Sequence, residues 1–122
     1  MDIKRFKLEI FIPESHLKVL QKTLQQVDAG HIGNYDSCLS YSVVTGTWRT
    51  LPGAQPYKGK ENEITEEKEI KAEVVVTKEK LQATYDAVCA MHPYEEPVIH
   101  IIPLWDISVS YTHLTLPTKR IV

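Results

Sequence analysis

The sequence contains little cysteine and no long hydrophobic run. Its two cysteines, Cys38 and Cys89, have no CxxC spacing, so neither a disulfide framework nor a cysteine-rich zinc site is expected. We interpret both as small core residues of a cytoplasmic protein, because free cysteine is common in the cores of proteins kept reduced. No apolar segment is long enough to cross a bilayer, and the N-terminal residues lack the apolar core of a signal peptide. We therefore expect no membrane partner.

Positive charge is also scarce. The chain has 14 Lys and Arg against 16 Asp and Glu, which gives a formal net charge of −2. Nucleic-acid-binding domains usually carry a basic patch or stripe, so we expect no nucleic-acid partner. What remains is an ordinary globular composition, with 43% hydrophobic and 25% charged residues. A chain of this kind can form one domain around a single core.

The C-terminal segment 108–122 stands apart from the rest of the chain. Residues 109–118 resemble the translation of a transposon-type sequencing adapter, so we set 108–122 aside as a non-native tail. The alternative is a native terminal strand, because the segment has fair β propensity. We assign a single domain to residues 1–107, and the sequence leaves open whether the natural chain stops at Ile107 or belongs to a longer protein.

The domain contains two similar halves. Residues 9–13 and 73–77 match at a fixed offset, and the apolar residues of the segments that follow them match at the same offset. Similarity at a fixed offset is typical of a repeated supersecondary unit. We therefore expect each half to fold in the same way.

The first half predicts a strand followed by a helix. Apolar side chains alternate over residues 6–12, the period of a strand with one buried face. Pro13 ends that strand and opens a helix, which closes at Gly30. The helix presents one apolar stripe at three- and four-residue spacing, formed by Leu17, Leu20, Leu24 and Val27.

The second half repeats this pattern. Residues 70–76 predict a strand, Thr77 is a plausible cap, and Pro93 ends the helix that follows. Residues 38–44 and 98–105 supply two more strands, the last at a sheet edge because it contains a proline. The order βαββαβ predicts an α+β, ferredoxin-like fold with a four-stranded antiparallel sheet and both helices on one face.

Three segments carry a resemblance to a known family. They are GHIGNYDSC (30–38), GTWRTLPGAQPYKG (46–59) and HPYEEP (92–97), which together with residues 12–16 resemble the YqfO-like family, also called Nif-three-like. In longer members this module is similar to PII signalling proteins and CutA, and it lies between the halves of a dinuclear-metal domain. The histidines and acids of that larger domain have no counterparts here, so its metal and its hydrolase role do not carry over.

The resemblance also carries expectations about assembly. It implies a PII/CutA-like fold and a homo-oligomer, with a trimer as the candidate state. Exposed edge strands of a four-stranded sheet agree with this expectation, because pairing between copies would cover them.

The hexapeptide at 92–97 is the first candidate site, with His92, Tyr94, Glu95 and Glu96 as ligand-binding candidates. His92 with Glu95 or Glu96 could ligate a divalent metal or transfer a proton. The alternative, which we favour, is a rigid turn fixed by two prolines, with Tyr94 packed inward and both acids in solvent.

The loop after the first helix is the second candidate. Its ligand-binding candidates are Gly30, His31, Gly33, Asn34, Tyr35 and Asp36. From the repeat offset we expect this loop at the same end of the sheet as residues 92–97. Pooled, the two loops would form a small-molecule or metal site with His31, His92 and Glu95 as metal ligands. The alternative is ordinary turn chemistry, in which glycines cap the helix and polar side chains bond locally.

A long loop is expected over residues 45–60. Trp48 beside Arg49 suits stacking on a flat ligand or contact with a neighbouring subunit. The alternative is that Trp48 and Leu51 fold back on the sheet. The mixed-charge run at 61–71 is interpreted as a solvated face or a strand entrance.

Together these patterns favour a cytosolic, oligomeric binding or regulatory module without catalytic residues, whose ligand is a small molecule or a divalent metal. The first alternative is a metal-dependent hydrolase acting through residues 92–97. Against it stands the absence of a nucleophile–base pair at a recognisable spacing. The second alternative is a fragment of a longer protein.

Overall fold

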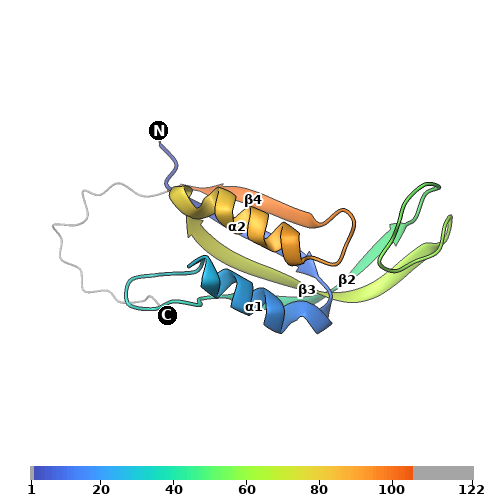
Figure 1. Ribbon diagram of the computed structural model, residues 1–122, viewed down its shortest axis with the longest axis horizontal. Helices are drawn as coiled ribbons and strands as arrows, with labels where there is room; N and C mark the ends of the chain where they lie inside the picture. Colours follow the sequence, from blue (N-terminus) through green and yellow to red (C-terminus); the bar gives the residue numbers. More distant parts are fainter. Residues whose placement is uncertain (1, 106–122) are drawn as a thin grey trace.

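The computed structural model describes residues 2–105, and it shows a four-stranded sheet with two helices on one face (Figure 1). The elements in chain order are β1 (Arg5–Ile12), the 3-10 turn η1 (Glu14–His16), α1 (Leu17–Gln26), β2 (Ser40–Arg49), β3 (Ile64–Thr77), α2 (Lys78–Met91) and β4 (Val98–Leu104). The strand order is β2-β3-β1-β4, and every neighbouring pair is antiparallel. The predicted ferredoxin-like fold is confirmed. The tail at 108–122 and the position of Ile107 lie outside the described residues.

The core lies between the helices and the sheet. The predicted alternation in β1 is confirmed, because every second residue from Leu8 to Ile12 is fully buried. Residues of β3, α1 and α2 complete the cluster, among them Ile70, Ala72, Val74, Val76, Leu20, Leu24 and Val88. In residues 2–105 neither helix is long and apolar enough to span a membrane. Cys38 and Cys89 are half-buried free thiols.

The other face of the sheet, which we call the open face, is charged. Lys7 Nζ lies 2.8 Å from Glu73 Oε1, and Lys71 Nζ lies 3.6 Å from Glu9 Oε2. These side chains alternate along β1 and β3 with the buried ones. The sheet therefore has one apolar side under the helices and one polar side away from them.

The β2–β3 hairpin is longer than predicted. Paired strands reach Arg49 and Ile64, so residues 64–71 extend the predicted strand at 70–76, in agreement with a strand entrance, and the loop is confined to residues 50–63. The hairpin projects beyond the helices (Figure 1), where it has no core to cover. Its residues therefore lack the apolar alternation by which strands are predicted, and backbone pairing holds them extended.

The corners that follow the two helices lie at opposite ends of the sheet. Because β1 and β3 are antiparallel, Arg5 faces Thr77 and Ile12 faces Ile70. Each helix runs back along the strand that precedes it, so the α1–β2 corner lies at the start of β1 and the α2–β4 corner lies at the end of β1 (Figure 1). The expectation that the corners emerge together is wrong, because a sequence offset carries no information about strand direction.

Candidate functional site

The α1–β2 corner is held by Gly30. This residue has φ +75°, and a Cβ there would overlap the carbonyl oxygen of Cys38. Its amide N–H donates to the Val75 carbonyl at 2.9 Å, and its carbonyl accepts from the Cys38 amide at 3.0 Å. Gly30 is thus required by backbone geometry, as the turn interpretation proposes.

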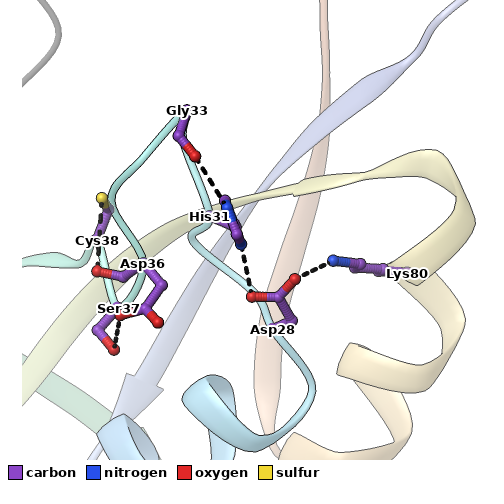
Figure 2. Close-up of polar contacts among 7 residues, drawn as sticks. All are labelled: Asp28, His31, Gly33, Asp36, Ser37, Cys38 and Lys80. Carbon is purple, nitrogen blue, oxygen red and sulfur yellow. Dashed lines mark hydrogen bonds and ion pairs between the residues drawn. The ribbon is translucent and has the colours of Figure 1, made fainter.

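His31 in this corner is engaged at both ring nitrogens. Nδ1 lies 2.8 Å from Asp28 Oδ1, and Nε2 lies 3.0 Å from the Gly33 carbonyl oxygen (Figure 2). Both neighbours are acceptors, so both contacts are hydrogen bonds only when both ring nitrogens carry a proton, and this geometry favours the imidazolium form. The hydrogen bond to Asp28 is the main cause that raises the pKa of His31. Asp28 also accepts from Lys80 of α2, which lowers the pKa of that carboxyl.

The rest of the loop bonds to itself. Ile32 and Tyr35 exchange backbone hydrogen bonds of 2.8 and 2.9 Å, and Ser37 Oγ donates to Asp36 Oδ1 at 3.1 Å (Figure 2). Asn34 and Tyr35 are exposed at the tip. These contacts are those of a local turn.

At the opposite corner, His92 ties the end of α2 to the end of β1. The side chain is buried, its Nε2 lies 2.7 Å from the Phe11 carbonyl oxygen, and its Nδ1 lies 3.1 Å from the Tyr94 amide nitrogen. The carbonyl requires an N–H at Nε2 and the amide requires a lone pair at Nδ1, so the ring is neutral. Burial lowers the pKa of His92 accordingly.

The predicted metal set of His31, His92 and Glu95 is therefore wrong. His31 lines a small cavity together with Arg5 and His92 binds Phe11, and the six residue steps from Arg5 to Phe11 along β1 span roughly 20 Å. Neither ring keeps a lone pair for an ion. Within residues 2–105 no group of three or more His, Cys, Asp or Glu side chains is placed to hold a metal.

A cavity of about 500 Å³ lies on the open face, between the α2–β4 corner and the β2–β3 hairpin. Its aromatic wall consists of Phe11, Trp48, Tyr57 and Tyr94. The ring of Tyr94 is at the centre, 6.0 Å from Trp48 and 5.9 Å from Tyr57 between centroids. Trp48 Nε1 donates to the Lys58 carbonyl at 3.3 Å. We call this space the aromatic cavity.

Glu69 of β3 forms the polar part of that wall. Only 7% of the residue is exposed, and its Oε1 accepts a 3.1 Å hydrogen bond from the Tyr94 hydroxyl. Burial, and then the charge of Glu69, raise the pKa of Tyr94. Oε2 lies against Gly46, where a Cβ would overlap it. A carboxylate is thus held at the edge of an apolar cavity.

Several predicted site residues meet at the aromatic cavity. Trp48, Arg49, Tyr94, Glu95 and Glu96 all line it. The Gln55 amide donates to Glu95 Oε1 at 2.9 Å, so the hairpin loop is tied to the 92–97 corner. The alternative in which Trp48 and Leu51 both fold back on the sheet is wrong for Leu51, which is 53% exposed. Trp48 lies within β2, is half-buried and lines the cavity, so its stacking on a ligand stays a prediction.

Sequence reasoning missed Glu69 and Thr50, and it noted Tyr57 in the long loop without naming it as a site residue. Glu69 lies in a mixed-charge run, where no apolar alternation indicates a buried residue. Its burial depends on Tyr94, which comes from a distant segment. One signal was available. Gly46 interrupts a strand, and a glycine there often marks the close approach of another group.

Comparisons with known proteins agree with this fold. The family model for CutA1, the divalent ion tolerance protein, matches residues 51–115. The chain belongs to the CutA1 family. The matched CutA1 segment includes β3, α2 and β4, and with them Glu69 and Tyr94.

Relatives of this CutA1-family chain also confirm the resemblance to the YqfO-like family. A Halalkalibacterium halodurans protein named GTP cyclohydrolase 1 type 2 homolog is 36% identical over 99 residues, which cover 81% of this chain and 27% of that protein. The structure of a Bacillus cereus protein related to NIF3 matches with a TM-score of 0.74 and 28% identity, over 85% of this chain and 26% of that one. The chain thus spans about a quarter of the length of these relatives.

A third comparison concerns the fold alone. CutA1 from Shewanella sp. SIB1 matches with a TM-score of 0.66 and 15% identity, over 93% of this chain and 94% of that one. The domain of this chain therefore corresponds to a whole CutA1 fold. These matches support a small binding or regulatory module of the CutA1 kind.

Proposed function

We propose that this CutA1-family domain is a regulatory module that binds a small molecule in the aromatic cavity. One observation carries the proposal: the two sequence segments 46–59 and 92–97 close around a single cavity. They meet through Tyr94, which contacts Trp48 and Tyr57, and through the bond from Gln55 to Glu95. A concave site with apolar walls and a few polar groups is typical of small-molecule binding.

The chemistry of the cavity favours binding over catalysis. The hydrolase alternative needs His92 as a metal ligand or a base, but both of its ring nitrogens are engaged with backbone groups. Glu95 accepts from a backbone amide. The remaining acid of that corner, Glu96, is exposed on the rim. These contacts suit a rigid wall better than a reaction centre.

Assembly and location belong to the same proposal. We propose a homo-oligomer, with a trimer as the candidate state, because the edge strands β2 and β4 expose Tyr41, Val43 and Ile101. If chains associate through these edges, the ligand lies either within the aromatic cavity of one subunit or between that cavity and a neighbouring subunit. The cytoplasmic location stays a prediction from cysteine usage.

The test is a ligand screen on the full chain with one tryptophan removed. The chain has two tryptophans, so Trp105→Phe makes Trp48 the only tryptophan, whose emission is excited selectively at the red edge of the absorption band. We expect fragments with flat rings to change Trp48 emission and to shift the NMR signals of Tyr57 and Tyr94.

Tyr94→Ala should reduce this binding at least tenfold, whereas the control Tyr35→Ala, at the other corner, should leave it unchanged. Light scattering on the same samples reports whether a second copy fills the cavity instead. Fragments that bind only elsewhere, or a Tyr94→Ala variant that binds as well as the parent, would contradict the proposal.

A further inference from the structure

The aromatic cavity contains a buried carboxylate that lacks a counter-ion. Glu69 is only 7% exposed, and its hydrogen-bond partner among the described residues is the neutral hydroxyl of Tyr94. Among residues 2–105, no cationic side chain forms an ion pair with Glu69. Removing a carboxylate from water without a partner charge costs several kcal/mol in proteins. A positive group in the cavity would offset that cost.

The cationic side chains that line the cavity bind residues other than Glu69. Lys58 and Arg49 both line the cavity, but Lys58 Nζ binds Glu67 Oε1 at 3.1 Å. Arg49 donates to Asn62 Oδ1 at 3.5 Å. The protein's own side chains thus leave the charge of Glu69 unbalanced.

A second buried polar group lies in the wall of the cavity at the hairpin-loop end, near Gly59. Thr50 lines the cavity, is 6% exposed, and its Oγ1 has no hydrogen-bond partner among the described residues. Buried hydroxyls are usually satisfied, and one that is not costs free energy. A ligand that carries N–H or O–H groups would satisfy it.

The aromatic wall favours the same sign of charge. Trp48, Tyr57 and Tyr94 present rings whose faces attract cations, with tryptophan the strongest of the three types. Glu95 and Glu96 add negative charge at the rim. The lining thus holds three carboxylates and several ring faces against two cationic side chains, Arg49 and Lys58, and this balance favours a cation over an anion.

From these observations we infer that the aromatic cavity selects an organic cation, a ligand in which an amine, guanidinium or quaternary ammonium group is attached to an apolar or aromatic body. The charged group lies at Glu69, and the body packs against Trp48 and Tyr57. This inference rests on the proposed function, because it names the ligand class of the same cavity.

The test uses two probes of nearly equal size. Benzylammonium and benzyl alcohol share the ring and differ in charge, and each is titrated into the full-length Trp105→Phe chain while Trp48 fluorescence is followed. We expect benzylammonium to bind at least tenfold more tightly than benzyl alcohol. In Glu69→Gln, a side chain of the same shape without charge, that ratio should fall to within about twofold.

Two controls separate this effect from unfolding and from general surface charge. Glu66→Gln removes an exposed acid from the same strand and should keep the tenfold preference. Circular dichroism should show that Glu69→Gln is folded, and its thermal midpoint should equal or exceed that of the parent, because an unbalanced buried charge is lost.

The outcomes distinguish the two proposals. Equal binding of both probes at Trp48 overturns the cation inference and leaves the binding function intact. Preference for benzylammonium that survives Glu69→Gln also overturns it, since the selectivity then comes from elsewhere. If neither probe nor any screened fragment reaches Trp48, the proposed function fails together with the inference.

Discussion

The carboxylate of Glu69 fills the space directly over Gly46, so closely that a methyl group on Gly46 would overlap Oε2. The two residues lie on the neighbouring strands β2 and β3, where Gly46 faces Glu67 and Val44 faces Glu69. Glycine within a strand weakens it and places no side chain. At this position it gives a charged side chain room to turn toward Tyr94.

This relationship predicts the effect of Gly46→Ala. The backbone there does not have the positive φ that favours glycine, so the cost comes from displacing Glu69 and breaking its bond to Tyr94. We expect a loss of about 1–2 kcal/mol in the free energy of unfolding, and at least tenfold weaker binding of benzylammonium. The exposed neighbour Thr45→Ala is the matched control. Parent-like binding in Gly46→Ala would show that Glu69 can move without consequence.

The hydrogen bonds of His31 predict that the α1–β2 loop becomes less stable at high pH. The pKa of His31 is raised above the ordinary 6.5 by Asp28, so the stabilisation of the loop is complete below about 6.5 and is lost as pH rises through the raised value. Amide hydrogen exchange at Ile32 and Tyr35, corrected for the intrinsic pH dependence of exchange, should accelerate in that range. Asp28→Asn should move the transition to lower pH. Protection that stays constant above pH 6.5 would be incompatible with the doubly donating ring.

The burial of His92 predicts the opposite pH dependence, a fold that becomes less stable at low pH. The pKa of His92 is lowered from 6.5 by burial, so its contribution to stability is complete above about 6.5 and is lost as pH falls through the lowered value, because the unfolded chain takes up a proton that the folded ring resists. Urea unfolding across this range should show the decrease.

Substitution of His92 gives a second measurement at neutral pH. His92→Ala removes the partner of the Phe11 carbonyl and of the Tyr94 amide, and it should cost roughly 2–4 kcal/mol. The decrease in stability at acid pH should become smaller in this variant. A full-sized decrease in His92→Ala would assign the acid sensitivity to another group.

Two glycines of the α1–β2 corner form a matched pair. Both have positive φ, but a Cβ on Gly33 meets open space, whereas one on Gly30 meets the Cys38 backbone. Gly33→Ala should cost about 1–2 kcal/mol for the backbone conformation alone. Gly30→Ala should cost at least about 2 kcal/mol more, because overpacking is added. Equal losses in chemical denaturation would mean that the corner relaxes freely.

Thr84 of α2 offers a stabilising change. The residue is fully buried, and its Oγ1 has no hydrogen-bond partner among the described residues. Thr84→Val replaces the hydroxyl by a methyl group of similar size and should raise the free energy of unfolding by about 1 kcal/mol. A lower stability in the variant would indicate that the hydroxyl is satisfied in solution.

The predictions from sequence succeeded where the signal is local and periodic. The alternation of Leu8 and Ile10 identified β1 and its buried face, and Pro93 marked the end of α2. The candidate site was predicted only in part. Trp48 and Tyr94 were selected from separate motifs, and the cavity that joins them required the β2–β3 hairpin to extend beyond the helices.

By itself, the sequence determined the order of elements, their buried faces and the family, because side-chain periodicity and motif residues are properties of short segments. The tertiary structure alone decided which segments meet. The antiparallel pairing of β1 with β3 separated His31 from His92, since equivalent corners of an antiparallel repeat lie at opposite ends. The same packing placed Tyr94, from a distant segment, against Glu69. This contact buries the Glu69 carboxylate in the wall of the aromatic cavity.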